Sequence, residues 1–161
     1  MAYMPTTNQT GAGIRAELPG GADAFIARGL IISSSDATAI LGTSSYHNVN
    51  VQGTVSAAQT AIRLGDDAQG HTGNSLFVGR DGYVAGLGNY FATELTGINS
   101  RVTIEGGVWS SAFGIQMNGE GADSRSVITN TGSIRAEWIA IRRTGDEDFV
   151  LRNSGEIVAG Y

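Results

Sequence analysis

The chain has 161 residues, the length of one domain, and 41 % of them are hydrophobic, which is enough for a core. Its formal charge is −5, its 10 basic residues are all arginine, and it has no cysteine. This composition excludes a nucleic-acid surface of clustered basic residues, a disulfide framework and a thiolate metal site.

Residues 1–21 precede the repeat and are polar and interrupted by glycine. As a cap, this segment would cover the first coil with Ile14 and Leu18, because the ends of repeat arrays need a shield. As an arm, it would reach a neighbouring subunit with Tyr3 and Met4. The segment lacks the basic start and apolar stretch of a classical signal peptide, so export would use another route, or a signal segment was removed and Met1 added.

A short phrase recurs through residues 22–161: a glycine, one free residue, then Ile or Val. Successive glycines lie 24, 29, 24, 26 and 23 residues apart. A period between about 20 and 50 residues is typical of solenoids, propellers and arrays. The six copies are Gly29-Leu30-Ile31, Gly53-Thr54-Val55, Gly82-Tyr83-Val84, Gly106-Gly107-Val108, Gly132-Ser133-Ile134 and Gly155-Glu156-Ile157.

Each unit has further fixed points: an apolar residue before the glycine, and a second apolar residue with a second glycine after it. Short β-branched runs between Gly, Asn, Asp and Ser predict strands, and no helical spacing is sustained. We therefore predict an all-β fold, a right-handed parallel β-helix (β-solenoid) of about six turns over 22–161. Its inward columns would include Val55, Val84, Val108 and Ile134. The second apolar points would be Ile40, Ile62, Leu95, Ile115 and Ile141.

In the first coil, residues 22–48, we expect the side chains of Phe25, Ile26, Ile31, Ile32 and Ile40 to point mainly inward. The third coil is expected to differ from the pattern, because Gly86–Tyr90 indicates an insertion of about three residues at a corner, where solenoids accept them. The corner glycines themselves are attributed to a need for positive φ.

The second glycine of the unit is followed by acidic residues in three coils. If these corners stack, carboxylates and loop carbonyls face one edge, and calcium takes such oxygen ligands. A solvated corner without metal is the alternative, and Thr96-Gly97-Ile98-Asn99 interrupts the acidic series. The calcium candidates are Asp66, Asp67, Glu120, Asp123, Asp146 and Asp148.

Other candidate chemistry is sparse. His47 and His71 are one repeat apart and could stack as metal ligands, but two imidazoles without a carboxylate make a poor site.

A glycan-cleaving enzyme needs two carboxylates about 5 to 10 Å apart across a sugar. Asp66 and Asp67 are adjacent and would point to opposite faces of a strand. We therefore expect a protein that is not an enzyme.

The two tryptophans are expected at the surface. Trp109 follows the inward Val108, and Trp138 precedes Ile139. Exposed tryptophans mark contacts with sugars or proteins, and filling of a wide corner is the alternative.

The sequence closes on the strand-like run Ile157-Val158-Ala159-Gly160-Tyr161. An uncovered strand templates pairing with another chain. Six coils at about 4.8 Å each make a rod only about 30 Å long. We expect head-to-tail stacking, a heterologous contact that gives a filament; self-capping by Tyr161 and a cut from a longer protein are the alternatives. The expected assembly residues are Tyr3, Met4, Phe25, Ile26, Ile157, Val158 and Tyr161.

The last two repeats, Val127–Ile134 and Val150–Ile157, follow the pattern I-x-N-x-G-x-I. They resemble rungs of bacterial secreted and surface right-handed β-helices, such as autotransporter passenger domains and haemagglutinin-like adhesins. Asparagine before the glycine suits a turn and can bond along a ladder. The resemblance implies an extracellular or cell-surface location and a structural or adhesive role. In earlier coils the matching positions are Val51, Arg80 and Ile104.

We therefore expect a non-enzymatic structural subunit that stacks with copies of itself into an extracellular filament or surface assembly. The alternative is a β-helical adhesin or a module that binds a receptor, a surface glycan or a protein, including a trimeric one of phage origin. We expect no nucleic-acid partner, no membrane insertion, and no cofactor other than the calcium considered above.

Overall fold

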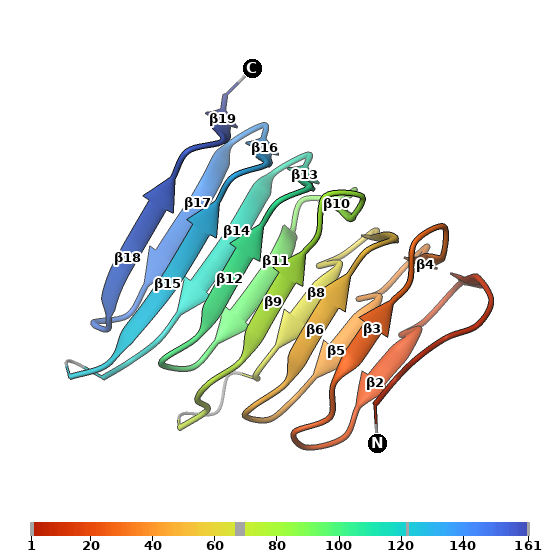
Figure 1. Cartoon of the computed structure of the whole chain (residues 1–161), viewed down its shortest axis with the longest axis horizontal. Helices are drawn as coiled ribbons and strands as arrows, with labels where there is room; N and C mark the ends of the chain where they lie inside the picture. Colours follow the sequence, from red (N-terminus) through yellow and green to blue (C-terminus); the bar gives the residue numbers. More distant parts are fainter. Residues whose placement is uncertain (1, 67–69, 122, 161) are drawn as a thin grey trace.

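The computed structural model describes residues 2–66, 70–121 and 123–160. These residues form strands and turns without a helix, and the strands build three parallel sheets around one core. Successive coils stack along the long axis of the molecule from the N-terminus to the C-terminus (Figure 1). The predicted fold, an all-β solenoid of about six turns, is confirmed.

The three sheets are called I, II and III in the order in which the chain visits them. Sheet I holds β1 (Gln9–Gly11), β4 (Ile31–Ser34), β7 (Thr54–Ala57), β10 (Tyr83–Gly86), β13 (Gly107–Ser110), β16 (Ser133–Ala136) and β19 (Glu156–Ala159). Sheet II holds β2 (Ala16–Leu18), β5 (Ile40–Gly42), β8 (Ile62–Leu64), β11 (Phe91–Thr96), β14 (Phe113–Asn118) and β17 (Ile139–Thr144). Sheet III holds β3 (Ala24–Ile26), β6 (Asn48–Val51), β9 (Ser75–Val78), β12 (Arg101–Ile104), β15 (Arg125–Asn130) and β18 (Asp148–Asn153).

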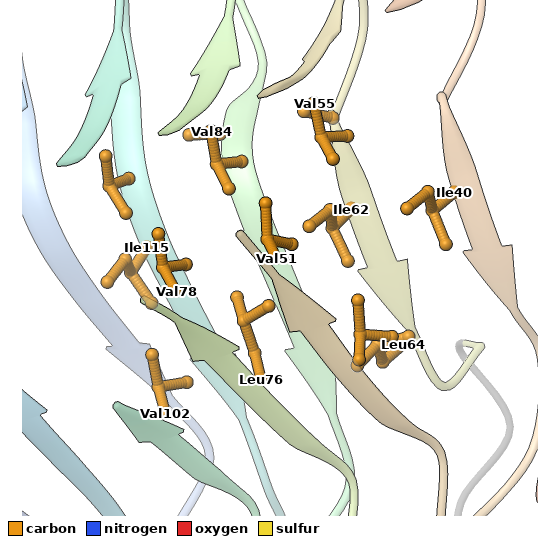
Figure 2. Packing of buried hydrophobic residues seen from close by; sticks show 14 of the residues in the cluster. Ile40, Val51, Val55, Ile62, Leu64, Leu76, Val78, Val84, Val102 and Ile115 are labelled. Atoms are coloured by element: carbon orange, nitrogen blue, oxygen red, sulfur yellow. The ribbon is translucent and has the colours of Figure 1, made fainter. Parts of the chain in front are cut away.

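Apolar side chains from all three sheets form continuous columns inside the solenoid. Val55 pairs with Val84, Val84 with Val108, and Val108 with Ile134, so the predicted column is confirmed. Figure 2 shows Val55 and Val84 of sheet I near residues of the other two sheets. Because these side chains are buried, the columns remove a large apolar area from water and supply the main stabilising term.

The first coil begins earlier than the sequence indicates. Within segment 1–21, strand β1 pairs with β4 and strand β2 pairs with β5, so both strands belong to the solenoid rather than to a separate cap or arm. Leu18 is buried, as a capping role required, but Ile14 is exposed. In the sequence, strand β2 is indicated by the short alternation of apolar and charged residues Ala16-Glu17-Leu18.

The register of the first glycine phrase is shifted by one residue from its expected position. Ile31 pairs with Thr54 and Ile32 with Val55, so Ile32 is inward and fully buried while Ile31 points out and is 40 % exposed. The expected inward position was therefore wrong for Ile31. It was also wrong for Phe25, which lies between the buried Ala24 and Ile26 on the outward side of β3. The III–I corner, between a strand of sheet III and the next of sheet I, has four residues after Ile26 but two after Val51.

Glycine recurs at the III–I corner because the backbones of successive coils come too close for a side chain. A Cβ atom at Gly132 would collide with the carbonyl oxygen of Gly106, and one at Gly155 with that of Gly132. Neither glycine has a positive φ. The predicted reason, a need for positive φ, was therefore wrong for these two glycines, where close approach is the physical reason. It is confirmed at the corner glycines Gly29, Gly65, Gly97 and Gly145, which have positive φ.

Sheet II corrects two further expectations. Thr93, not Leu95, pairs with both Ile62 and Ile115, and Leu95 instead pairs with Leu64 at the next inward position. The predicted insertion at Gly86–Tyr90 is present at the I–II corner: six residues separate β10 from Thr93, against four between β7 and Ile62. The insertion is thus two residues long rather than about three.

Asparagine replaces the aliphatic residues of one sheet III column near the C-terminal end. Asn130 pairs with Ile104 and Asn153, and Val78 stands in the earlier position that the sequence pattern gave to Arg80. Asn130 is buried, and its Nδ2 donates to Oδ1 of Asn153 at 2.8 Å. The expected asparagine ladder is therefore present.

Candidate functional site

The last coil of the described residues, β17 to β19, leaves its inward side chains partly uncovered. Leu151 occupies an inward column of sheet III, yet it is 43 % exposed. Ile141, Phe149 and Ile157 pack against the core but are only partly buried. No described strand pairs with the outer edges of this coil. Unpaired N–H and C=O groups beside apolar side chains form a surface suited to pairing with another chain.

The N-terminal coil is better covered. Ala16, Leu18 and Ala24 are buried at the equivalent inward positions. Tyr3 bridges to Ala24 at the edge of sheet III, and its ring packs against the core. Burial raises the pKa of the Tyr3 phenol, and the charge of Arg15 opposes that shift. Strands β1 and β2 remain the edge strands of sheets I and II in the described residues.

The structure separates the predicted assembly residues into three groups. Met4 is exposed, and Tyr3, Phe25, Ile157 and Val158 are partly buried, so these retain surface.

Ile26, in contrast, is fully buried within the chain and has no area left for a partner, so its assignment to an interface was wrong. It was predicted there because it lies near the start of the repeat. Tyr161 lies outside the described residues.

One outward column of sheet II carries opposite charges at its two ends. In register the column runs Glu17, Leu41, Arg63, Glu94, Gln116 and Arg142. Glu17 and Arg142 are both exposed. Within the column, the neighbours Arg63 and Glu94 already form an ion pair at 3.4 Å. A second copy continuing sheet II would place its Glu17 beside Arg142 in the same geometry.

Three of the calcium candidates form hydrogen bonds or ion pairs with different groups of the chain. Oδ1 of Asp66 contacts Nε2 of His71 at 2.6 Å, and Oδ1 of Asp146 accepts from the N–H of Gly121 at 2.7 Å. Asp148 pairs with Arg125 at 3.6 Å.

Glu120 and Asp123 are exposed, and Asp67 lies outside the described residues. Among the described residues, no three His, Asp or Glu side chains gather as a metal site would require. Calcium therefore receives no support from the geometry.

The acidic corner instead contains a buried carboxylate, Glu147, that was not among the calcium candidates. Glu147 is 4 % exposed; Oε1 accepts from the N–H of Asn99 at 2.6 Å and Oε2 from Oγ of Ser126 at 2.7 Å. Arg143 donates to the Glu147 carbonyl oxygen. The carboxylate thus joins three successive coils at the II–III corner, and this network is structural.

The two histidines do not stack. Asn48 pairs with Ser75, which places Asn74 rather than His71 opposite His47. His47 is buried: its Nδ1–H donates to the Ala22 carbonyl at 2.9 Å, and its Nε2 accepts from the N–H of Ser44 at 3.2 Å. Because both ring nitrogens are engaged, His47 is a structural residue of the core.

Aromatic side chains, of which Tyr90 and Trp138 are exposed, gather at the I–II corner of three successive coils. Phe91 pairs with Phe113, and Phe113 with Ile139. The Phe91 and Phe113 ring centroids are 5.0 Å apart, and the Trp138 ring stands edge-on to Phe113 at 5.4 Å. The aromatic ridge is defined as Leu87, Tyr90, Phe91, Phe113, Trp138 and Ile139.

Several ridge side chains are well exposed to solvent. Trp138 is 57 % exposed, as its predicted outward position requires, and Tyr90 and Leu87 are also exposed. The Arg142 guanidinium lies 5.9 Å from the Phe113 ring centroid, a cation–π geometry. Trp109 also points outward, in sheet I between Ala85 and Arg135, but it is partly buried. Only the register of the coils brings Phe91, Phe113 and Trp138 together.

None of the described residues forms a helix with the length and hydropathy needed to cross a membrane. Comparison of the chain with protein-family models, with curated proteins and with solved structures gives no significant match.

Proposed function

We propose that the protein is a non-enzymatic structural subunit that stacks end to end with copies of itself into an extracellular filament or surface assembly. The observation that carries this proposal is the uncovered apolar coil β17 to β19, whose Leu151 is 43 % exposed in an inward column. A stacked copy would bury these side chains and pair the free strand edges. Because the two ends differ, the contact is heterologous and can repeat without closing.

Charge complementarity supports the second copy as the occupant. Continuation of sheet II places Arg142 of one copy next to Glu17 of the following copy, in the column where Arg63 and Glu94 already pair. Sheet I would continue in the same way through β19 and β1. The Tyr3 bridge covers the corresponding edge of sheet III, so sheets I and II would carry most of the contact.

Negative-stain electron microscopy and sedimentation velocity test this assembly. The unmodified chain should form polymers whose length rises with concentration. Arg142→Glu and Glu17→Arg should each shorten the polymers, because each change places two like charges side by side. The double variant should restore them. Arg101→Glu changes the same charge on the outward side of the central strand β12 and should leave the polymers unchanged.

A chain that stays monomeric at high concentration in every salt condition would contradict the proposal. In that case the alternative, a discrete adhesin, would explain the exposed ridge but not the uncovered coil. The extracellular location is part of the proposal and is supported by the resemblance of the Asn-containing rungs to secreted β-helices.

A further inference from the structure

The end strands of the solenoid limit how a second copy can follow the first. Strands β1, β2 and β3 belong to one coil, and β16, β17 and β18 belong to another. The contact between Arg142 and Glu17 requires that β2 of the following copy lies on β17. In that arrangement β1 of the following copy takes the position of β19, beside β16, and its Tyr3 takes the position of β18, beside β3. Because two segments cannot share one position, one of each pair must leave.

The N-terminal segment, defined as residues 2–11, forms the shorter pairings of the two competitors. In sheet III it makes one bridge: the N–H of Tyr3 donates to the Asp23 carbonyl at 2.7 Å, and the N–H of Phe25 donates to the Tyr3 carbonyl at 2.9 Å. In sheet I it contributes the three residues of β1. Strands β18 and β19, in contrast, have six and four residues. Replacement of the segment by these strands therefore adds backbone pairing.

The hydroxyl of Tyr3 weakens the attachment of the N-terminal segment. It is buried and has no hydrogen-bond partner among the described residues. A buried hydroxyl without a partner costs on the order of 1 to 3 kcal/mol, because it has lost its hydrogen bonds to water. Release of the segment returns this hydroxyl to water.

The inward column of sheet I also favours the exchange. Gln9 pairs with Ile32 and so ends a column that is otherwise aliphatic. Ile157 stands at the same column position at the other end of the chain, where it pairs with Ile134. With β19 in place of β1, Ile157 would lie on Ile32 of the following copy. An isoleucine removes more apolar area from water there than a glutamine does.

The corresponding column of sheet III gains a cover for its last residue. Leu151 is 43 % exposed in the single chain, and its column continues through the coils to Ala24 at the other end. With β18 in place of the N-terminal segment, Leu151 would lie on Ala24 of the following copy. A large side chain then packs against a small one.

We propose that, on stacking, β18 and β19 of one copy replace the N-terminal segment of the following copy. This inference rests on the proposed end-to-end assembly and specifies its partner surface. Sheet II then runs from β17 to β2 of the following copy and sheet III from β18 to β3. Sheet I runs from β19 to β4, instead of to β1, so all three sheets continue strand by strand. Addition of a strand from another chain to a sheet edge is an established mode of recognition.

The N-terminal segment has a second role in this arrangement. In the single chain it covers the outer edges of β3 and β4. Because an uncovered edge pairs with other chains, the segment protects a newly folded subunit until the correct strands displace it.

A disulfide between β1 and β4 tests whether the segment must leave. Thr10 and Ser33 are register partners on the outward face of sheet I, and the chain has no cysteine of its own. Neighbouring strands lie about 4.8 Å apart, a separation that a disulfide can span. In Thr10→Cys/Ser33→Cys, oxidation ties β1 to β4. Sedimentation velocity should then show loss of the polymers, and reduction with dithiothreitol should restore them.

The matched control ties two strands that stay together in the stack. In Ser33→Cys/Ser56→Cys the disulfide joins β4 to β7, whose Ser33 and Ser56 Oγ atoms are 3.0 Å apart. Oxidation of this pair should leave the polymers unchanged. Mass spectrometry confirms that each disulfide forms within one chain.

A substitution without cysteine gives a second measurement. Gln9→Ile places an aliphatic side chain on Ile32 and holds the N-terminal segment more firmly. It should raise the concentration at which polymers appear by about three- to tenfold. Thr10→Ile, on the outward side of the same strand, should leave that concentration unchanged.

The outcomes separate the exchange from stacking itself. Equal polymers from oxidised and reduced Thr10→Cys/Ser33→Cys would show that β1 stays in place, which overturns the exchange but leaves stacking intact. Loss of polymers on oxidation of the control pair as well would also overturn the exchange, since the effect would not come from β1. A chain that forms no polymer in any of these states overturns both proposals.

Discussion

The carboxylate of Glu156 accepts two hydrogen bonds from the Arg135 guanidinium, from Nε at 3.1 Å and from Nη2 at 2.7 Å. The two residues lie on neighbouring strands, β16 and β19, on the outward face of sheet I. Oγ of Ser133 donates to the same oxygen at 3.1 Å. These hydrogen bonds hold β19 against β16 of the preceding coil.

This contact predicts a dependence of stability on pH. The hydrogen bonds from Arg135, and then the one from Ser133, lower the pKa of Glu156 below its usual value of 4.5. A lowered folded-state pKa contributes stability that is present above about pH 4.5 and is lost as the pH falls through the folded pKa.

Thermal melts of the unmodified chain and Glu156→Gln check this. The unmodified chain should melt at the higher temperature at neutral pH, and the difference should shrink on acidification below about pH 4.5. Glu137→Gln, which removes an exposed carboxylate, is the control. A difference between the unmodified chain and Glu156→Gln that is constant with pH would contradict the prediction.

The register of the first coil can be tested with two adjacent isoleucines. Ile32→Ala should lower the free energy of unfolding by about 2 to 5 kcal/mol, because it opens a cavity in a buried column. Ile31→Ala, on the exposed side of the same strand, should change it by less than about 0.5 kcal/mol. Urea unfolding of both variants measures the difference, and equal losses would show that the register is shifted.

Close approach of coils at the III–I corner predicts a severe effect of one methyl group. Gly132→Ala should destabilise the fold by about 1 to 3 kcal/mol or more, because its Cβ would collide with the Gly106 carbonyl oxygen. Gly20→Ala should be tolerated, since a Cβ there meets Oγ of Ser44 at an ordinary 3.4 Å. If urea unfolding shows both variants to be equally stable, the coils do not touch as described.

The buried carboxylate at the II–III corner should be sensitive to truncation. Glu147→Ala leaves the Asn99 N–H and the Ser126 hydroxyl without their acceptor, which costs on the order of 1 to 3 kcal/mol for each group left unsatisfied. Glu147→Gln keeps one acceptor oxygen and should lose less. Chemical unfolding compares the two, and a tolerant Glu147→Ala would show that water replaces the carboxylate.

The repeat could be predicted from sequence because the inward residues and the corner glycines keep their order in every coil. Val55, Val84, Val108 and Ile134 form one column as expected. The predicted inward position of Ile31 was wrong because the repeated pattern of glycine, one residue and Ile or Val does not show on which side of the corner extra residues lie.

The same limit applies to the functional surfaces. Thr93 replaces an aliphatic residue in a buried column and hides the correct alignment from Leu95. The aromatic ridge depends on that alignment, since Phe91 and Phe113 become neighbours only in the structural register. The partners of Glu147 are 48 and 21 residues away in sequence, so its burial has no local signal.

Because each strand pairs with strands one coil earlier and one coil later, the chain can fold progressively from a first stable coil. Each new coil needs only the preceding one as its template, as in other repeat proteins whose stability comes from nearest neighbours. The close contacts at the glycines of the III–I corner strengthen this dependence, because a coil cannot pack there before the preceding coil has formed. A chain emerging from a narrow channel, one coil at a time, could therefore build its rod in the order of emergence.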